Sequence, residues 1–171
     1  NLTFAANSRE LEVIDGDIRD PGTVASAVAG VEGIFHEAAL VSVPTSVEQP
    51  RHSLVIKAQG SFDVFEAARR AGVKRIVFAT SNHAVGFYRR TQIIDHKVYI
   101  KPDGRYGVSK VFGEALGSLY ADKYGMQVFL MRIGNVNPEP IDKRRLSIWL
   151  SPRDLAQLVQ IGIDHPDVKF E

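Results

Sequence analysis

The sequence predicts an α/β fold in which a parallel sheet is covered by helices, and two observations support this. Apolar runs of strand length alternate with helical segments along the whole chain, which is the pattern of parallel strands joined by crossover helices. The 171 residues, 44% of them hydrophobic, are enough for one domain with a buried core. We therefore expect residues 1–171 to form a single domain.

The segment from residue 11 to residue 36 predicts two strands with a short helix between them. Leu11–Ile14 and Gly33–His36 are apolar runs of the length of buried strands. Asp20 before Pro21 is typical of a helix N-cap followed by the first helical position, and Gly30 is typical of a helix end.

A long helix and a third strand are expected next. Between Leu54 and Ala68 apolar side chains recur in steps of three and four residues, which predicts one buried helix face, and Gly72 is a typical end. Arg75–Thr80 has the pattern of a strand. The segment Ser81–Gly104 is irregular and longer than most connections in a compact domain, and loops of that length are usually functional or disordered.

The last part of the chain predicts two more helices and two more strands. A helix is expected at Tyr106–Tyr124, and a strand at Val128–Ile133. Ser151 and Pro152 are typical of the N-cap and first position of a further helix. The apolar run Val168–Phe170 predicts a final strand.

Composition and charge exclude several classes of function. The formal net charge is +1 and both signs are interspersed, so we expect neither a nucleic-acid nor a membrane partner. No apolar run approaches the roughly 20 residues of a membrane-spanning helix. Without cysteine there is no thiolate nucleophile or cysteine zinc site, and no histidine and carboxylate spacing suggests another metal site. We expect a cytoplasmic protein with a small-molecule partner.

Tyr106 and Lys110 carry the strongest chemical signal. They are four residues apart at the start of a helix, so they share one face and lie within reach of each other. A phenol with an unperturbed pKa of about 10 is a poor base at neutral pH, but a nearby ammonium stabilises the phenolate. Tyr106 could then accept a proton from an alcohol. Ser81 follows a strand at the end of the sheet where ligands bind, so its hydroxyl could hold the reacting oxygen.

Several motifs occur in a fixed order along the chain. They are Gly16–Asp20 after a strand, the Ala38–Ala39 pair after His36, Glu66–Arg75, Ser81, and Tyr106–Lys110 with the sequence Tyr-Gly-Val-Ser-Lys. In this order they resemble the extended short-chain dehydrogenases, also called the NAD-dependent epimerase/dehydratase family, over almost the whole chain. The resemblance implies a Rossmann-type doubly wound parallel sheet, NAD as the cofactor, and Ser81, Tyr106 and Lys110 as the catalytic set.

The resemblance also implies where NAD binds. The implied cofactor-binding residues are Asp17, Ile18, Ala38, Ala39, Leu40, Tyr106, Lys110 and Ile133. The sequence has no strand followed by a glycine fingerprint, so we expect the first strand, helix and second strand of the fold to be missing here or supplied by another chain. The acid that selects NAD over NADP follows that second strand, so NAD is chosen by analogy.

From Ser81 onward the chain resembles one subgroup, the uronate dehydrogenases. The similar blocks are Ser81–Tyr88, Arg105–Lys110, Pro138–Pro140 and Arg144–Ser151. They imply NAD-dependent oxidation of a hexuronate, glucuronate or galacturonate, at C1 to an aldarolactone. Arg144 would bind the sugar carboxylate through two parallel hydrogen bonds. The other implied substrate contacts are Ser46, Ser81, Asn82 and Asn135.

Other features leave two further interpretations open. Val41–Pro50 resembles sugar-nucleotide epimerases, and so does Asn135, because uronate dehydrogenases usually carry serine there. Lys57 stands three residues before Gly60, where the family has an asparagine that helps to shape the active site. The chain could therefore be a UDP-sugar epimerase or dehydratase, or a non-catalytic dinucleotide-binding protein.

Some residues also have a structural interpretation. His83 is expected to pack or bond locally, and His36 to satisfy backbone groups. Arg144 stands in a basic cluster of a kind that is usually a solvated face. The helices around Phe62 and Tyr106 are the usual dimer faces of such enzymes, so we expect a homo-oligomer.

Overall fold

The computed structural model of the chain describes residues 11–37 and 48–170. Four residues that the resemblance assigns to cofactor or substrate lie outside these ranges: Ala38, Ala39, Leu40 and Ser46. Their roles stay predictions.

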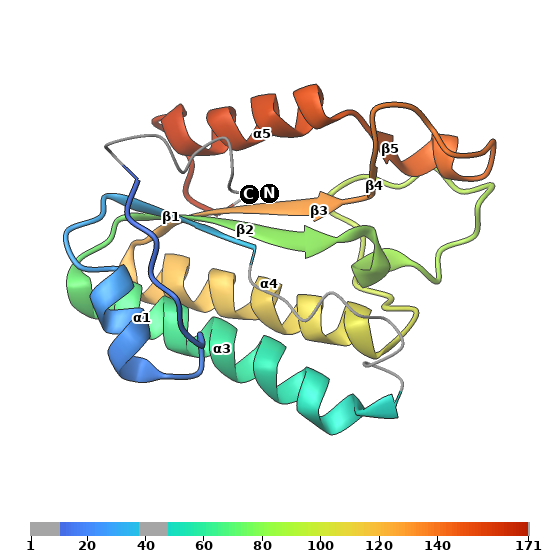
Figure 1. Cartoon of the computed structure of the whole chain (residues 1–171). Helices are drawn as coiled ribbons and strands as arrows, with labels where there is room; N and C mark the ends of the chain where they lie inside the picture. The colour runs from blue at the N-terminus through green and yellow to red at the C-terminus, as the bar shows by residue number, and fades with distance from the viewer. Residues whose placement is uncertain (1–10, 38–47, 171) are drawn as a thin grey trace.

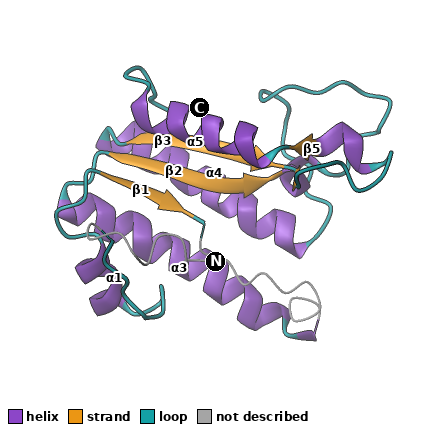
Figure 2. Ribbon diagram, turned by 45° about the horizontal axis from the view of Figure 1, so that its top comes forward, coloured by secondary structure: helices purple, strands orange, loops and turns teal. Residues whose placement is uncertain are grey.

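Helices cover both faces of a central sheet. Helices α1 (Pro21–Ala27), α3 (Pro50–Ala71) and α4 (Arg105–Tyr124) lie on one face, and α5 (Pro152–Asp164) lies on the other (Figure 1). Helix α3 packs between α1 and α4, so these three helices form one layer (Figure 2). The predicted doubly wound α/β fold is confirmed.

The sheet contains three parallel strands in the order β1-β2-β3, as far as the described residues extend. They are β1 (Gly33–His36), β2 (Arg75–Ser81) and β3 (Gln127–Ile133), each within a residue of its prediction. Ser81 pairs with Ile133, which brings the carboxyl ends of β2 and β3 to one edge of the sheet. The side chains that follow these strands therefore meet at that edge.

The helix boundaries follow from their capping residues. The side chain of Asp20 accepts a hydrogen bond from the backbone N–H of Thr23 at 2.8 Å, and Ser151 Oγ accepts one from the N–H of Asp154 at 3.0 Å. In both helices proline occupies the first turn. Helix α3 ends at Gly72, whose φ of 78° is the left-handed conformation that glycine adopts without strain.

An aromatic cluster joins α3, β2 and α4 in the core. The ring of Phe65 lies 6.0 Å from that of Phe78 and 5.3 Å from that of Tyr120, and all three side chains are buried. Such tilted pairs add to the stabilisation from apolar burial. The cluster fixes α4 against both α3 and the sheet, and so fixes the residues at the start of α4.

Of two further predicted strands, one is absent and the other is reduced to a single bridge. Leu11–Ile14 forms no strand, and Leu11, Val13 and Ile14 are exposed. A strand needs a hydrogen-bonded neighbour, and no strand in the described part of the chain pairs with this segment. Val168–Phe170 is reduced to one bridge, between Phe170 and Val128.

Apolar side chains remain exposed on α3 and α4, among them Leu54, Val55, Phe62, Val108, Phe112 and Leu119. The expected homo-oligomer through these helices stays a prediction. No helix in the described ranges is long and apolar enough to cross a membrane.

Candidate active site

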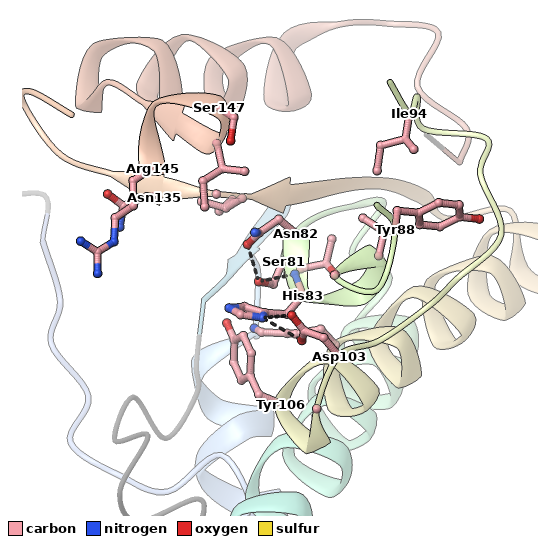
Figure 3. A pocket seen from close by; sticks show the side chains of 18 of the residues that line it. Ser81, Asn82, His83, Tyr88, Ile94, Asp103, Tyr106, Asn135, Arg145 and Ser147 are labelled. Atoms are coloured by element: carbon pink, nitrogen blue, oxygen red, sulfur yellow. Dashed lines mark hydrogen bonds and ion pairs between the residues drawn. The ribbon is translucent and has the colours of Figure 1, made fainter. Parts of the chain in front are cut away.

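The carboxyl edge of the sheet opens into a cavity of about 1250 Å³. Seven residues singled out from the sequence line it: Ser81, Asn82, Tyr106, Lys110, Ile133, Asn135 and Arg144. Figure 3 shows Ser81, Asn82, Tyr106 and Asn135 around this space. The irregular segment before α4 also lines the cavity, through Tyr88 and other side chains.

Ser81 is both a cap and a cavity residue. It ends β2 and is the N-cap of the short 3₁₀ helix η2 (Asn82–Val85). Its Oγ accepts a hydrogen bond from the N–H of His83 at 3.3 Å and donates one to Oδ1 of Asn82 at 3.3 Å. The side chain is buried but faces the cavity, so the cap holds the hydroxyl in one place.

Tyr106 and Lys110 lie on the first two turns of α4 and point into the same cavity. The Lys110 ammonium is 5.8 Å from the centre of the Tyr106 ring and donates a hydrogen bond to the carbonyl of Ala79 at 2.7 Å. Lys110 is only 6% exposed, and this burial, together with repulsion from Lys57, lowers its pKa to about 8. The predicted proximity of the phenol and the amine is present.

Lys110→Met is expected to change how stability depends on pH. The folded pKa is about 8, whereas a freely exposed lysine has 10.5, so between these values the unfolded chain binds more protons than the folded one. The contribution of Lys110 to the free energy of unfolding therefore increases as the pH rises through this window. Below about pH 8 the buried charge lowers the free energy of unfolding by its full amount. Lys110→Met removes this buried charge. The Tm of the variant minus that of the wild type should therefore be largest near neutral pH and should decrease toward pH 10.5.

Thermal unfolding followed by circular dichroism across this range measures the effect. The matched control is Lys123→Met, because Lys123 is on the same helix but exposed. Parallel Tm curves for Lys110→Met and the wild type would contradict the prediction.

His83 packs and bonds as predicted, with Nδ1 2.9 Å from the Asp103 carboxylate and its ring centre 5.6 Å from that of Tyr106, and it also lines the cavity. For His36 a bond to backbone groups was predicted, but its hydrogen bond within the described residues joins Nε2 to Oγ of Ser61 at 3.0 Å. Burial, with repulsion from Lys110, lowers the pKa of His36 to about 4, so it is neutral at physiological pH.

The two neighbouring arginines of the basic cluster have different environments. Arg145 is ion-paired with Asp142 at 2.8 Å, whereas Arg144 has no carboxylate partner within the part of the chain that the structure describes. Both line the cavity. Asn135 lies at the start of β4 (Asn135–Val136), and its Oδ1 accepts a hydrogen bond from Asn137 at 2.7 Å. Arg144 is therefore better placed than Arg145 to bind an anion.

Asp17 and Ile18 lie apart from this cavity. They line a second one of about 390 Å³, beside the carboxyl end of β1. Glu37 lines both cavities, so the two adjoin. A hydrogen-bonded ion pair with Arg19 holds the pKa of Asp17 at about 2, so the carboxylate is charged. Within residues 11–37 and 48–170 no cluster of histidine and carboxylate could hold a metal ion.

Lys57 also faces the cavity, at the position where the family has an asparagine that helps to shape the active site, but its contact with Tyr106 was not predicted. It lies on α3, is 5% exposed, and donates a hydrogen bond to Oγ of Ser53 at 3.0 Å. Its ammonium is 4.9 Å from the centre of the Tyr106 ring. The departure from the usual asparagine thus places a second cation beside the tyrosine.

Residues 1–151 match the model of the NAD dependent epimerase/dehydratase family. The chain belongs to this family. It is 43% identical over 157 residues to a uronate dehydrogenase of Pseudomonas putida. The aligned part covers 92% of this chain and 57% of the relative. The chain thus spans somewhat more than half the length of this curated relative.

Solved structures show the same similarity to uronate dehydrogenases. A mutated uronate dehydrogenase superimposes with a TM-score of 0.89 at 39% identity, over 96% of this chain and 58% of that one. A mutant of the uronate dehydrogenase from Agrobacterium tumefaciens, in complex with NAD, superimposes with a TM-score of 0.83 at 40% identity, over 92% of this chain and 58% of that one. The resemblance to this family and to uronate dehydrogenases, inferred from short motifs, is confirmed.

Proposed function

We propose that this chain carries the active site of an NAD-dependent dehydrogenase that oxidises a hexuronate, such as glucuronate or galacturonate, at C1 to an aldarolactone. The observation that carries the proposal is the meeting of Ser81, Tyr106 and Lys110 in one cavity with an arginine, Arg144, that has no described carboxylate partner. A base, a cation beside it, a hydroxyl donor and an anion site are the groups that this reaction requires.

Ser81, Tyr106 and Lys110 would each have a separate role in the proton transfer. Ser81 Oγ, fixed by its capping bonds, would hold the C1 oxygen of the sugar. Tyr106 would take the hydroxyl proton as the C1–O bond becomes a carbonyl. The Lys110 ammonium, 5.8 Å from the ring, would stabilise the phenolate that accepts this proton. NAD, when bound, supplies the acceptor for the hydride that leaves C1.

The described residues fit such a cofactor. The smaller cavity at Asp17 and Ile18 adjoins the catalytic cavity through Glu37, so an elongated dinucleotide could extend from one to the other along the carboxyl ends of the strands. Ile133 and Lys110 line the catalytic end of this path. We propose that Asp17 and Ile18 bind the adenine end and that Lys110 binds the nicotinamide ribose.

The second candidate is a sugar-nucleotide epimerase, favoured by Asn135. Its amide lines the cavity where uronate dehydrogenases usually carry serine, and it could bind a sugar hydroxyl of a larger substrate. The same Ser81, Tyr106 and Lys110 would then serve a transient oxidation. The two functions differ in whether reduced cofactor accumulates.

Incubation with NAD and either a free uronate or a UDP-sugar separates the candidates. Glucuronate or galacturonate is expected to yield NADH, measured by its absorbance, while UDP-glucose yields none. Conversion of the UDP-sugar without net NADH would instead favour the epimerase, and NAD binding without turnover of any sugar would favour a non-catalytic protein.

Substitution of Arg144 tests the proposed contact with the carboxylate of the substrate. Arg144→Met is expected to raise KM for the uronate about 10-fold to 100-fold, the scale of lost hydrogen bonds to a charged group. Arg145→Met is the matched control, because Arg145 is already held by Asp142. Equal effects of the two substitutions would remove Arg144 from the substrate site.

A further inference from the structure

Lys57 is an ammonium buried beside the candidate base. Its side chain is 5% exposed, and within the described ranges its hydrogen-bond partner is a neutral hydroxyl, Ser53 Oγ, with no carboxylate in an ion pair. A buried charge is costly unless an opposite charge compensates it. Burial accordingly lowers the pKa of Lys57.

Two helices thus bring two cations to one phenol. The Lys57 ammonium lies 4.9 Å from the centre of the Tyr106 ring, from α3, and the Lys110 ammonium lies 5.8 Å from it, from α4. The two like charges repel, which contributes to the lowered pKa of Lys110. If Tyr106 loses its proton, the phenolate is an anion close to both ammonium groups, and for Lys57 it supplies the opposite charge that the described residues do not.

We propose that Lys57 is a positioning residue that acts through Tyr106, as a second ammonium that stabilises its phenolate from α3, whereas Lys110 does so from α4. This rests on the proposed function, because it assigns Lys57 a part in the same proton transfer. The asparagine usual at this position is neutral and could not take this role.

The other ionisable groups around the tyrosine do not replace this cation. They include His36 and Glu37 at the end of β1, His83 of η2, Asp103 in the loop before α4, and Arg105 and Lys110 of α4. His36 is neutral at physiological pH, and the Asp103 carboxylate accompanies His83. Glu37 counteracts the burial of Lys110, since it raises that pKa.

A spectroscopic titration tests the proposal without substrate or cofactor. Ionisation of Tyr106 is isolated as the phenolate absorbance of the protein minus that of Tyr106→Phe, measured against pH. In the Lys57→Met background the midpoint of this difference is expected to move up by about one pH unit, the scale of one opposite charge at such a distance. Lys57→Arg keeps the charge and is expected to keep the midpoint near its original value.

The matched control is Lys123→Met. Lys123 also lies over a tyrosine ring, that of Tyr124 at 5.5 Å, but at the far end of α4 and exposed to solvent. Its removal should leave the Tyr106 midpoint in place. Lys57→Asn is a second variant with the residue usual in the family, and circular dichroism verifies that each variant is folded.

Turnover gives the second readout. In Lys57→Met the acid limb of the kcat profile is expected to shift upward by the same amount, so that kcat on the limb falls about 10-fold and recovers on the plateau, with KM unchanged. A uniform loss at every pH, or an unmoved absorbance midpoint, would overturn the role of Lys57. Absence of uronate turnover in the wild type would refute the proposed function instead, and the absorbance titration would still decide the role of Lys57.

Discussion

Tyr106→Phe is expected to reduce turnover about 100-fold to 10,000-fold, the usual contribution of a general base. The substitution removes one hydroxyl and keeps the ring that contacts His83, Lys57 and Lys110. The free energy of unfolding should therefore change little, and the affinity for NAD should fall only by the contact of the lost hydroxyl. Steady-state kinetics with a uronate, cofactor titration and thermal unfolding measure the three quantities.

Tyr88→Phe is the matched control for this loss. Tyr88 lines the same cavity and also has an ammonium, that of Lys101, 5.0 Å from its ring centre, but its hydroxyl is held in a hydrogen bond that it donates to the carbonyl of Tyr99 at 2.9 Å. Its removal should cost a few-fold in turnover at most. Full activity of Tyr106→Phe would refute the assignment of Tyr106 as the base.

Most of the fold could be predicted because its signals are local. Each of the three strands is a short apolar run in a sheet covered on both faces, and the first turns of α1 and α5 combine a capping side chain with proline. Leu11–Ile14 has the same apolar pattern but forms no strand. Apolar composition predicts burial in a sheet, whereas strand formation also depends on a neighbour, which the segment itself cannot reveal.

The candidate site was predictable only where one element or one strand end defines it. The spacing of Tyr106 and Lys110 places both on one helix face, and Ser81 follows a strand that ends at the ligand edge of the sheet. Lys57 and Tyr106 come together because α3 packs on α4, and no spacing rule links residues on two helices. The ion pair that occupies Arg145 and leaves Arg144 available is local, because Asp142 lies three residues before Arg145, so this spacing could have been recognised in the sequence.

At Gly107 the start of α4 lies close against η2. A Cβ at this position would overlap the backbone carbonyl of His83 and lie 3.0 Å from Cβ of Pro102. Backbone cannot rotate away as a flexible side chain can, so the first turn of α4, which carries Tyr106, must shift. The glycine of the Tyr-Gly-Val-Ser-Lys motif is therefore explained by packing rather than by backbone conformation.

Gly107→Ala is accordingly expected to lower turnover about 100-fold, the effect of displacing a catalytic group by about 1 Å. Overpacking costs about 1–3 kcal/mol, and alanine recovers about 1 kcal/mol in helix propensity, so the free energy of unfolding should fall by about 2 kcal/mol at most. Such a loss of stability leaves nearly all molecules folded and cannot account for the lost turnover. Kinetics and denaturant unfolding of the same preparation separate the two effects.

Gly104→Ser is the control for Gly107→Ala. Gly104 precedes the same helix, its backbone is extended with φ of −177°, and a Cβ there would meet no atom within 4 Å. Serine is a favoured N-cap residue, so this substitution should leave stability unchanged or raised and turnover within a few-fold of the wild type. If both variants kept full activity, the position of Tyr106 would not depend on the contact between α4 and η2. A loss confined to Gly107→Ala would instead tie proton transfer to the close packing of this one glycine against η2, the 3₁₀ helix that Ser81 caps.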